Sequence, residues 1–427
     1  MTPLAPETEC VPSSETEDVP FDVARILAAR SIRSQYQPIF SVLSQRLVGL
    51  EALARAVDPE TKAPVPPLHL FEAAERRGLT LDLDRLCREK AVEGFAAMLD
   101  CEPLLFLNLD VSILQDGVVG SGHLSGVLEK FGVPARRVVI ELVESRIGDI
   151  RAMHRFLDAH RAQGYLIALD DVGAGNSNLD RILEARPDIL KLDRSLIAGV
   201  DREYRKQEML SCCMRIAHKL GIVVITEGVE TESEAMCCLE RGADLMQGFY
   251  FARPCFPGPN WQVAEGLCKA RELGVALRQR ERERFAARKE RYGKYASIAA
   301  RMCAVPERTP PEEWADAIRV EMANHPVVEC VYLLDQSGIQ ITDTIFAPGR
   351  QGDRCSLLFA PAATGADQGS KEYLICLGPQ QPRYVTDPYI SRATGTVCVT
   401  LSTLVPLRNG RTVVVCVDMD STCGMRE

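Results

Sequence analysis

Polar side chains end one short apolar run after another through the first half of the chain. Six runs finish in a residue that can bind a metal ion or exchange a proton, and a seventh leads to Gln247: Glu51, Asn108, Glu141, Asp170 (with Asp171 next), Lys191 and Glu227. A single such residue is ordinary, but the repetition describes a ring of strands with a polar site at one rim. The pattern predicts a (β/α)8 barrel, whose active site lies at the C-terminal ends of its strands.

Strand-like and helix-like stretches alternate between residues 21 and 258, which predicts an α/β fold. The expected strands are Tyr36–Val42, Leu47–Arg55, Leu104–Leu109, Val138–Val143, Leu166–Asp170, Ile189–Leu192, Ile222–Glu227 and Leu245–Phe251. Only about Leu43–Arg46 separates the first two, whereas a parallel crossover needs about a dozen residues or more. We therefore expect a TIM-like barrel that opens with a hairpin and has one antiparallel strand.

Three further segments flank this region. Residues 1–20 carry five acids and no base and are expected to be a disordered acidic tail. Residues 259–304 are expected to form a linker helix, in which Phe285, Tyr292, Tyr295, Ala299 and Met302 recur at heptad-like spacing. This spacing fits a solvated connecting helix or a short coiled coil that pairs two subunits, and fewer than three heptads do not decide between them.

Residues 305–427 predict a separate α+β domain. Its expected elements are a helix at Glu312–Ala323 and strands at Val328–Leu334, Ile339–Thr344, near Tyr373–Leu377, Val397–Val405 and Thr412–Asp418. The last two strands are joined through Arg408-Asn409-Gly410, a hairpin signal.

The composition excludes several classes of protein. A formal charge of −9 argues against a nucleic-acid polymer as the partner. No apolar run approaches the about 20 residues of a membrane span, and the N-terminus does not look like a secretory signal. Sixteen cysteines without a Cys-x-x-Cys pair, and six histidines, indicate buried thiols in a reducing cytoplasm rather than a zinc site.

The chemistry of the predicted rim follows from its charge. Five carboxylates that converge on one cavity repel one another strongly unless cations are present: Glu51, Glu141, Asp170, Asp171 and Glu227. With the amide of Asn108 the donor set is all oxygen, which favours Mg²⁺ or Mn²⁺. The adjacent Asp170 and Asp171 can ligate two ions, an arrangement that suits attack on a phosphodiester, and Lys191 can stabilise the developing charge.

The same runs resemble the EAL family of cyclic di-GMP phosphodiesterases. The motifs that carry the resemblance are Tyr36-Gln37-Pro38-Ile39, Glu51-Ala52-Leu53, Phe106-Leu107-Asn108-Leu109, Ile140-Glu141-Leu142-Val143-Glu144, Asp170-Asp171, Lys191-Leu192-Asp193, Thr226-Glu227-Gly228-Val229-Glu230 and Gln247-Gly248-Phe249. They cover about residues 21–258, and their number, order and spacing are specific.

The resemblance implies a site with two Mg²⁺ or Mn²⁺ ions, inhibited by Ca²⁺, that cleaves cyclic di-GMP to linear pGpG. Metal ligands would be Glu51, Asn108, Glu141 and Asp170 for one ion, and Asp170, Asp171 and Glu227 for the other. Catalytic roles would fall to Lys191 and Glu227, substrate contacts to Gln37, Arg55 and Gln247, and support of the loop after Asp171 to Glu144, Asp193 and Glu230. A homodimer through the barrel and the linker helix is also expected.

One loop departs from the family pattern. Where the family usually has Phe after the two aspartates and Tyr-Ser-Ser further on, this chain has Val172 and Asn176-Ser177-Asn178. Losing the aromatic residues would weaken the second metal site. The alternative is therefore a weak or inactive receptor that binds cyclic di-GMP and signals through the linker helix.

The C-terminal region looks like a Cache or PAS-type sensor. The resemblance lies in Asp335-Gln336-Ser337-Gly338, Asp387-Pro388-Tyr389-Ile390 and the closing strand that ends at Asp418. It implies a regulatory domain that binds an unknown small molecule, with Arg383, Tyr389 and Asp418 as candidate pocket residues. These three residues are equally compatible with ordinary loop and edge positions, and the domain with dimerisation alone.

Overall fold

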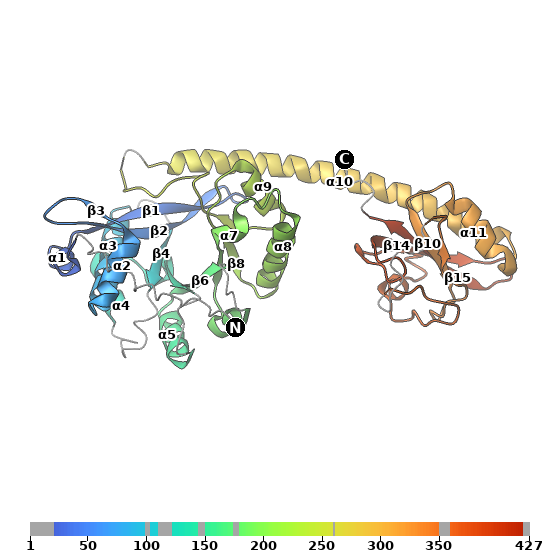
Figure 1. The fold of residues 1–427 in the computed structure, drawn as a ribbon, viewed down its shortest axis with the longest axis horizontal. Coiled ribbons are helices and arrows are strands. Elements are labelled where there is room, and N and C mark those ends of the chain that lie inside the picture. Colours follow the sequence, from blue (N-terminus) through green and yellow to red (C-terminus); the bar gives the residue numbers. More distant parts are fainter. Residues whose placement is uncertain are drawn as a thin grey trace, which may run out of the picture. The chain divides into compact units, whose positions relative to one another are not determined.

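The computed structural model describes residues 21–98, 103–109, 122–143, 150–173, 179–258, 261–349 and 359–421 (Figure 1). The predicted acidic tail, Glu144 and Asn176 lie outside these residues. The chain divides into two compact units, and the boundary along the chain lies between Arg280 and Glu281.

A closed barrel forms the first unit. Its described strands are β1 (Ile32–Ser41), β2 (Arg46–Val57), β4 (Leu104–Leu109), β5 (Val138–Val143), β6 (Leu166–Val172), β7 (Ile189–Leu192), β8 (Val223–Thr226) and β9 (Leu245–Met246). They follow the order β1-β9-β8-β7-β6-β5-β4-β2, and the pairing of β1 with β2 closes the ring, while β3 (Pro64–Val65) pairs antiparallel with the end of β2. Because β1 is antiparallel to both β2 and β9, and the other ring neighbours are parallel, the predicted barrel with one reversed strand is confirmed.

Helices cover the outside of this barrel. They are α1 (Val23–Ala28), α2 (Pro67–Arg76), α3 (Thr80–Ala96), α4 (His123–Phe131), α5 (Ile150–Ala162), α6 (Leu179–Ala185), α7 (Arg194–Ile197), α8 (Tyr204–Lys219) and α9 (Glu232–Glu240). Strand residues such as Leu105, Ile140 and Leu169 are buried in the large core between strands and helices. Alternate residues point to the opposite face of each strand and fill the barrel interior.

The interior holds one layer of apolar side chains below the rim. The layer consists of Ile39, Phe106, Val139, Ala168, Ile189, Ile225 and Leu245, each from a different strand. On β2 the corresponding place belongs to Gly49, where a Cβ would lie 2.3 Å from the Phe106 ring. This apolar layer lies directly beneath the residues at the strand ends.

The last strand of the barrel is shorter than the predicted Leu245–Phe251. Only Leu245–Met246 is extended, because the chain turns at Gly248, whose carbonyl accepts a hydrogen bond from the Phe251 amide at 3.1 Å. Around this turn the loops after β8 and β9 come into contact, with the Val229 amide donating to the Gln247 carbonyl at 3.1 Å.

Replacing Gly248 by Ala is expected to lower the free energy of unfolding by about 1–3 kcal/mol, the usual effect of overpacking. A Cβ there would lie 2.0 Å from the Val229 carbonyl oxygen, so backbone rather than a flexible side chain must move. Gly126→Ala in α4 is the matched control, because nothing lies near its Cβ and Ala is the better helix former. Chemical denaturation measures both, and an unchanged midpoint for Gly248→Ala would contradict the close approach.

Helix α10 (Val263–Arg308) contributes to both cores. Ala270, Leu273 and Leu277 belong to the core of the barrel unit. Tyr295, Ala299 and Met302 belong to the core of the second unit. Burial within their own unit accounts for part of the heptad-like spacing, so these three residues are not available for the coiled coil that the sequence left open.

The second unit is an α+β domain, as predicted. Its described elements are a 3-10 turn (Pro311–Glu313), α11 (Trp314–Met322), α12 (Glu372–Ile375), β10 (Val328–Leu334), β11 (Ile345–Phe346), β12 (Arg383–Val385), β13 (Tyr389–Ile390), β14 (Val397–Pro406) and β15 (Thr412–Asp420). The sheet is antiparallel in the order β11-β10-β15-β14-β12, with β13 also on β14.

Two predictions for this unit are wrong. The apolar run near Tyr373–Leu377 belongs to the helix α12 rather than to a strand. A run this short does not distinguish helical periodicity from the alternation of a strand, which is why the prediction failed. Residues Ile339–Thr344 form isolated bridges, such as that between Leu334 and Gln340, instead of a regular strand. Among the described helices, none has the length and apolar character that crossing a membrane requires.

Candidate active site

A ring of polar side chains lies directly above the apolar layer of the barrel. Two residues beyond each interior apolar position, in the direction of the rim, the strands carry Glu51, Asn108, Glu141, Asp170, Lys191, Glu227 and Gln247, and the reversed strand β1 carries Gln37 two residues before Ile39. Because the side-chain period of a strand is two, these residues share the interior face. Ion pairs and hydrogen bonds described below link all eight, so the structure brings them together as the sequence predicted.

Lys191 lies at the centre of this ring. Its side chain is 1% exposed, and its Nζ lies 2.6 Å from Glu141 Oε1, 2.6 Å from Glu227 Oε1, 3.2 Å from Asp170 Oδ1 and 3.7 Å from Glu51 Oε1. Burial alone would lower the pKa of the ammonium, but the carboxylates outweigh it and hold that pKa well above its usual value. A single ammonium group is thus shared by four carboxyl groups.

The pKa values of Glu141 and Glu227 reflect burial and the surplus of negative charge at this site. Glu141 is fully buried, and burial raises its pKa well above the ordinary value despite the attraction of Lys191. Burial likewise raises the pKa of Glu227 to about 8, with Asp170 and Glu51 adding repulsion. Without a further cation, the Glu227 carboxyl group favours the protonated form at neutral pH, and the raised pKa of Glu141 shifts that group in the same direction.

Amide groups fix the position of Glu51. The Asn108 Nδ2 donates to Glu51 Oε1 at 3.1 Å, and the Gln247 Nε2 donates to Glu51 Oε2 at 2.5 Å. Gln247 also donates to Gln37 Oε1 at 3.2 Å, and Gln37 donates to the Ala252 carbonyl at 3.4 Å. Gln247 therefore supports Glu51 directly, and Gln37 supports it through Gln247. The predicted contact of the two glutamines with a dinucleotide stays a prediction.

A β-bulge at the end of β6 contains the two aspartates, Asp170 and Asp171. The register between β6 and β7 shifts between Leu169 and Val172, and Asp171 has φ of 58° in the left-handed region. Bulges and such strained positions concentrate at functional sites, where they redirect side chains. Asp170 stays in the interior ring while Asp171 lines the neighbouring cavity, and burial followed by repulsion from Asp170 raises the pKa of Asp171.

Two predicted supporting residues lie beside this bulge. The Asp193 amide donates to the Val172 carbonyl at 3.0 Å, and its side chain caps α7 by accepting from the Ser195 amide at 2.9 Å. Glu230 forms an ion pair at 2.8 Å with Arg194 of α7. Val172, in place of the aromatic residue usual in the family, is buried in the outer core. Support by Glu144 lies outside the described residues.

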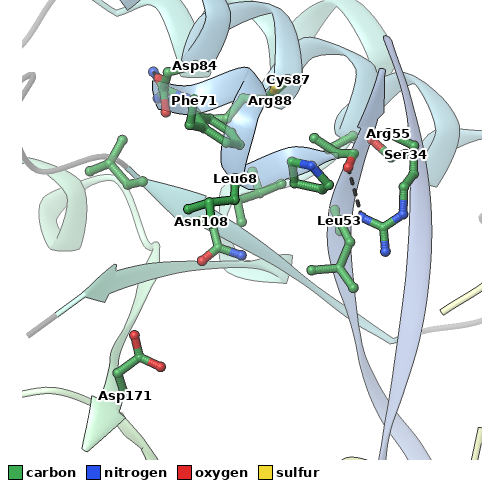
Figure 2. A pocket seen from close by; sticks show the side chains of 16 residues that line it. Ser34, Leu53, Arg55, Leu68, Phe71, Asp84, Cys87, Arg88, Asn108 and Asp171 are labelled. Atoms are coloured by element: carbon green, nitrogen blue, oxygen red, sulfur yellow. Dashed lines mark hydrogen bonds and ion pairs between the residues drawn. The ribbon is translucent and has the colours of Figure 1, made fainter. Parts of the chain in front are cut away.

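A cavity of about 590 Å³ opens next to the ring (Figure 2). Arg55, Asn108 and Asp171 line it together with apolar side chains from α2, among them Leu68 and Phe71. The Arg55 Nε donates to Gln35 Oε1 at 2.7 Å, and burial lowers the pKa of its guanidinium. The cavity places a cation and apolar walls beside the carboxylates, which suits an anionic ligand with flat, partly apolar groups.

Sequence reasoning missed two lining residues on α3. Asp84 and Arg88 form an ion pair one helical turn apart, and both border the cavity in Figure 2. The i, i+4 spacing is visible in the sequence, but it is equally typical of a solvated helix face. Their place at the cavity depends on how α3 packs over β2 and β4.

The ring is compatible with divalent cations although no cage is preformed. Among the described residues, no three acidic, His or Cys side chains are already arranged around a vacant metal position, because the Lys191 ammonium lies among the carboxylates. However, the donors are all oxygen, and Glu141 Oε2 has no hydrogen-bond partner within the described part of the chain. A buried carboxylate oxygen without a donor, in a cluster with surplus negative charge, fits a hard divalent ion.

Comparison with known proteins gives the family. The family model described as "EAL domain" matches residues 22–254, more than half of the chain. The chain belongs to the EAL domain family. The match includes every predicted residue of the barrel site, since these lie between Gln37 and Gln247.

Curated relatives match about half of the chain. Cyclic di-GMP phosphodiesterase RocR of Pseudomonas aeruginosa is 31% identical over 241 residues, which are 55% of this chain and 60% of RocR. Signaling protein YkoW of Bacillus subtilis is 30% identical over 224 residues, which are 52% of this chain and 28% of YkoW. The chain thus spans less than two thirds of the length of these relatives.

A solved structure shares the fold of both units. The crystal structure of Bacillus subtilis YkuI, with an EAL domain and in complex with the substrate c-di-GMP and calcium, has a TM-score of 0.75 and 22% identity to this chain. The alignment covers 94% of this chain and 100% of that one. At this identity the likeness concerns the fold alone, including the helix and the second unit.

Proposed function

We propose that this protein is a cyclic di-GMP phosphodiesterase that hydrolyses one phosphodiester bond to give linear pGpG. The observation that carries the proposal is the convergence of four carboxylates on Lys191 at the rim of an EAL-family barrel. RocR, which is similar to this chain over 60% of its own length, is a cyclic di-GMP phosphodiesterase.

The ring and the adjacent Asp171 would together hold two Mg²⁺ or Mn²⁺ ions. One ion would be held by Glu51, Asn108, Glu141 and Asp170, the other by Asp170, Asp171 and Glu227. Bound there, the ions would polarise the phosphodiester and make water a stronger nucleophile. Ca²⁺ is expected to inhibit, because it prefers longer bonds and a looser geometry than Mg²⁺.

The chain's own residues would orient the reactants and move the proton. With divalent ions to offset the burial and repulsion that raise its pKa to about 8, Glu227 would be ionised and suited to accept the proton of the attacking water. Lys191, 2.6 Å from Glu227 Oε1, holds this carboxyl group in place and offsets negative charge that develops on the phosphate. Arg55 at the cavity would bind the anionic dinucleotide. Water adds across one P–O bond, so the ring opens and one phosphate becomes terminal.

Incubation of the purified full chain with cyclic di-GMP and Mn²⁺, followed by chromatography, tests the proposal. The expected product is pGpG, and EDTA should stop its formation. Binding of the dinucleotide without pGpG, in Mg²⁺ and in Mn²⁺, would instead favour the receptor alternative. Val172 and the departure at Asn176 are the features that favour this alternative.

Regulation by the second unit and assembly into a homodimer through the barrel and α10 complete the proposal. The exposed Phe285 of α10, at 71%, is compatible with such an assembly, but partial burial of the heptad-like residues leaves fewer of them for it. A cytoplasmic location stays a prediction of the sequence.

A further inference from the structure

The second unit contains a cavity that the barrel chemistry does not use. It has a volume of about 640 Å³ and lies on one face of the antiparallel sheet. The opposite face packs on α10 and α11 through Val331, Leu333 and the odd-numbered residues of β15. Alternation along the strands therefore points Tyr332 and Asp418 toward the cavity, which both residues line.

Asp418 is a buried carboxylate on this face. It is 2% exposed and accepts hydrogen bonds from the Thr400 hydroxyl at 2.7 Å, from Ser391 at 3.4 Å and from the Cys330 thiol at 3.5 Å. Within the described part of the chain, no Lys, Arg or His forms an ion pair with it, and burial raises its pKa to about 6. A buried carboxylate that is mostly ionised at neutral pH has a strong preference for a cationic partner.

Gln340 provides an acceptor without a donor in the same cavity. Its side chain is 1% exposed, lines the same cavity, and its Oε1 has no hydrogen-bond partner among the described residues. The orientation of the amide is fixed, because Nε2 lies 2.9 Å from the Thr342 carbonyl and 3.0 Å from the Ala362 carbonyl. A flipped amide would place oxygen against those two carbonyl oxygens. The cavity therefore contains an amide oxygen, Gln340 Oε1, without a hydrogen-bond donor, and a buried carboxylate, Asp418, without an ion-pair partner within the described part of the chain.

The walls of the cavity favour a cation as well. Three tyrosines line it, Tyr332, Tyr373 and Tyr389, and the lining has four carboxylates against two basic side chains. Tyr389 shares a hydrogen bond of 2.5 Å with Thr400, whose hydroxyl donates to Asp418. These consecutive hydrogen bonds hold Tyr389 beside the Asp418 carboxylate. Aromatic faces and net negative charge together attract organic ammonium groups.

We propose that this cavity binds a small organic molecule that carries an ammonium group, with the ammonium directed toward Asp418 and Gln340. Tyr389 and Asp418 were both predicted as pocket residues and both line the cavity, whereas Arg383 is exposed on β12 and is absent from the described lining. The ammonium group is the shared chemistry of free amines and amino acids. The inference concerns binding alone and stands independently of activity at the barrel.

Isothermal titration of the full chain tests this inference. Tyramine and putrescine represent free amines, L-phenylalanine represents amino acids, and tyrosol and butanediol are the neutral counterparts of the two amines. Saturable binding is expected for at least one ammonium compound and not for the neutral compounds. Preference for tyramine or putrescine over L-phenylalanine would identify amines as the source, and the reverse would identify amino acids.

Asp418→Asn is expected to weaken binding of the preferred compound about tenfold to a hundredfold, because it removes the charge but keeps the shape. Asp316→Asn is the matched control, since this carboxylate is exposed on α11 and forms its ion pair with Arg319 of the same helix. Failure of all three ammonium compounds to bind, equal binding of tyrosol and tyramine, or unchanged affinity in Asp418→Asn would each overturn the inference. The comparison of tyramine with tyrosol needs no variant, so it decides even if Asp418→Asn does not fold.

Discussion

Replacing Lys191 by Met is expected to lower the free energy of unfolding by about 3–5 kcal/mol in metal-free buffer, the usual effect of removing one partner of a buried ion pair. The ammonium lies within 3.7 Å of four carboxylates, and two of these contacts are 2.6 Å. Methionine keeps the length of the side chain but leaves Glu141 buried without a neighbouring positive charge. Urea unfolding in EDTA measures the effect.

The same variant separates the roles of the ammonium and of divalent ions. If Mn²⁺ binds among these carboxylates, it should raise the unfolding temperature of Lys191→Met by more than that of the unmodified protein, because the ion replaces the missing charge. Turnover should still fall about a hundredfold to a thousandfold, as for loss of other groups that stabilise a developing charge. Lys294→Met is the control, since Lys294 is exposed on α10 and pairs with Glu290. Equal stabilisation of both proteins by Mn²⁺ would show that the ion does not bind at this cluster.

The barrel and its polar ring were predictable because both follow from short-range rules. A side-chain period of two, combined with short apolar runs, puts Glu141 above Val139 and Lys191 above Ile189 without any knowledge of the tertiary structure. The four-residue gap before Leu47 was enough to reverse one strand, since a parallel connection does not fit. These inferences needed only spacing along the chain.

What the sequence did not reveal depends on side-chain direction and on packing. It predicted that crowded carboxylates require divalent ions, but the structure shows that Lys191 itself neutralises part of the charge. Which of the five nearby acidic side chains Lys191 contacts depends on how the barrel closes. Likewise, the burial of Asp84 and Arg88 at the cavity depends on the packing of α3, and the helix at Glu372–Ile375 on contacts of Tyr373 with the sheet.

Glu227→Gln is expected to reduce turnover about a hundredfold to ten-thousandfold, because an amide cannot accept the proton of the attacking water. Binding of cyclic di-GMP should be retained to a large extent, since Arg55 and the cavity walls are unchanged. Turnover and binding are measured separately, by chromatography of pGpG and by titration with the dinucleotide. Glu203→Gln, an exposed carboxylate before α8, is the control.

Stability gives an independent measure of the same residue. The pKa of Glu227 rises from 4.5 to about 8 on folding, so the folded state holds this proton more tightly than the unfolded state does. The unmodified protein therefore loses stability as the pH rises from about 4.5 to about 8, while glutamine stays neutral throughout. In EDTA, Glu227→Gln should gain stability relative to the unmodified protein across this window. A constant difference in unfolding free energy across it, together with full turnover, would reject both the buried charge and the catalytic role of Glu227.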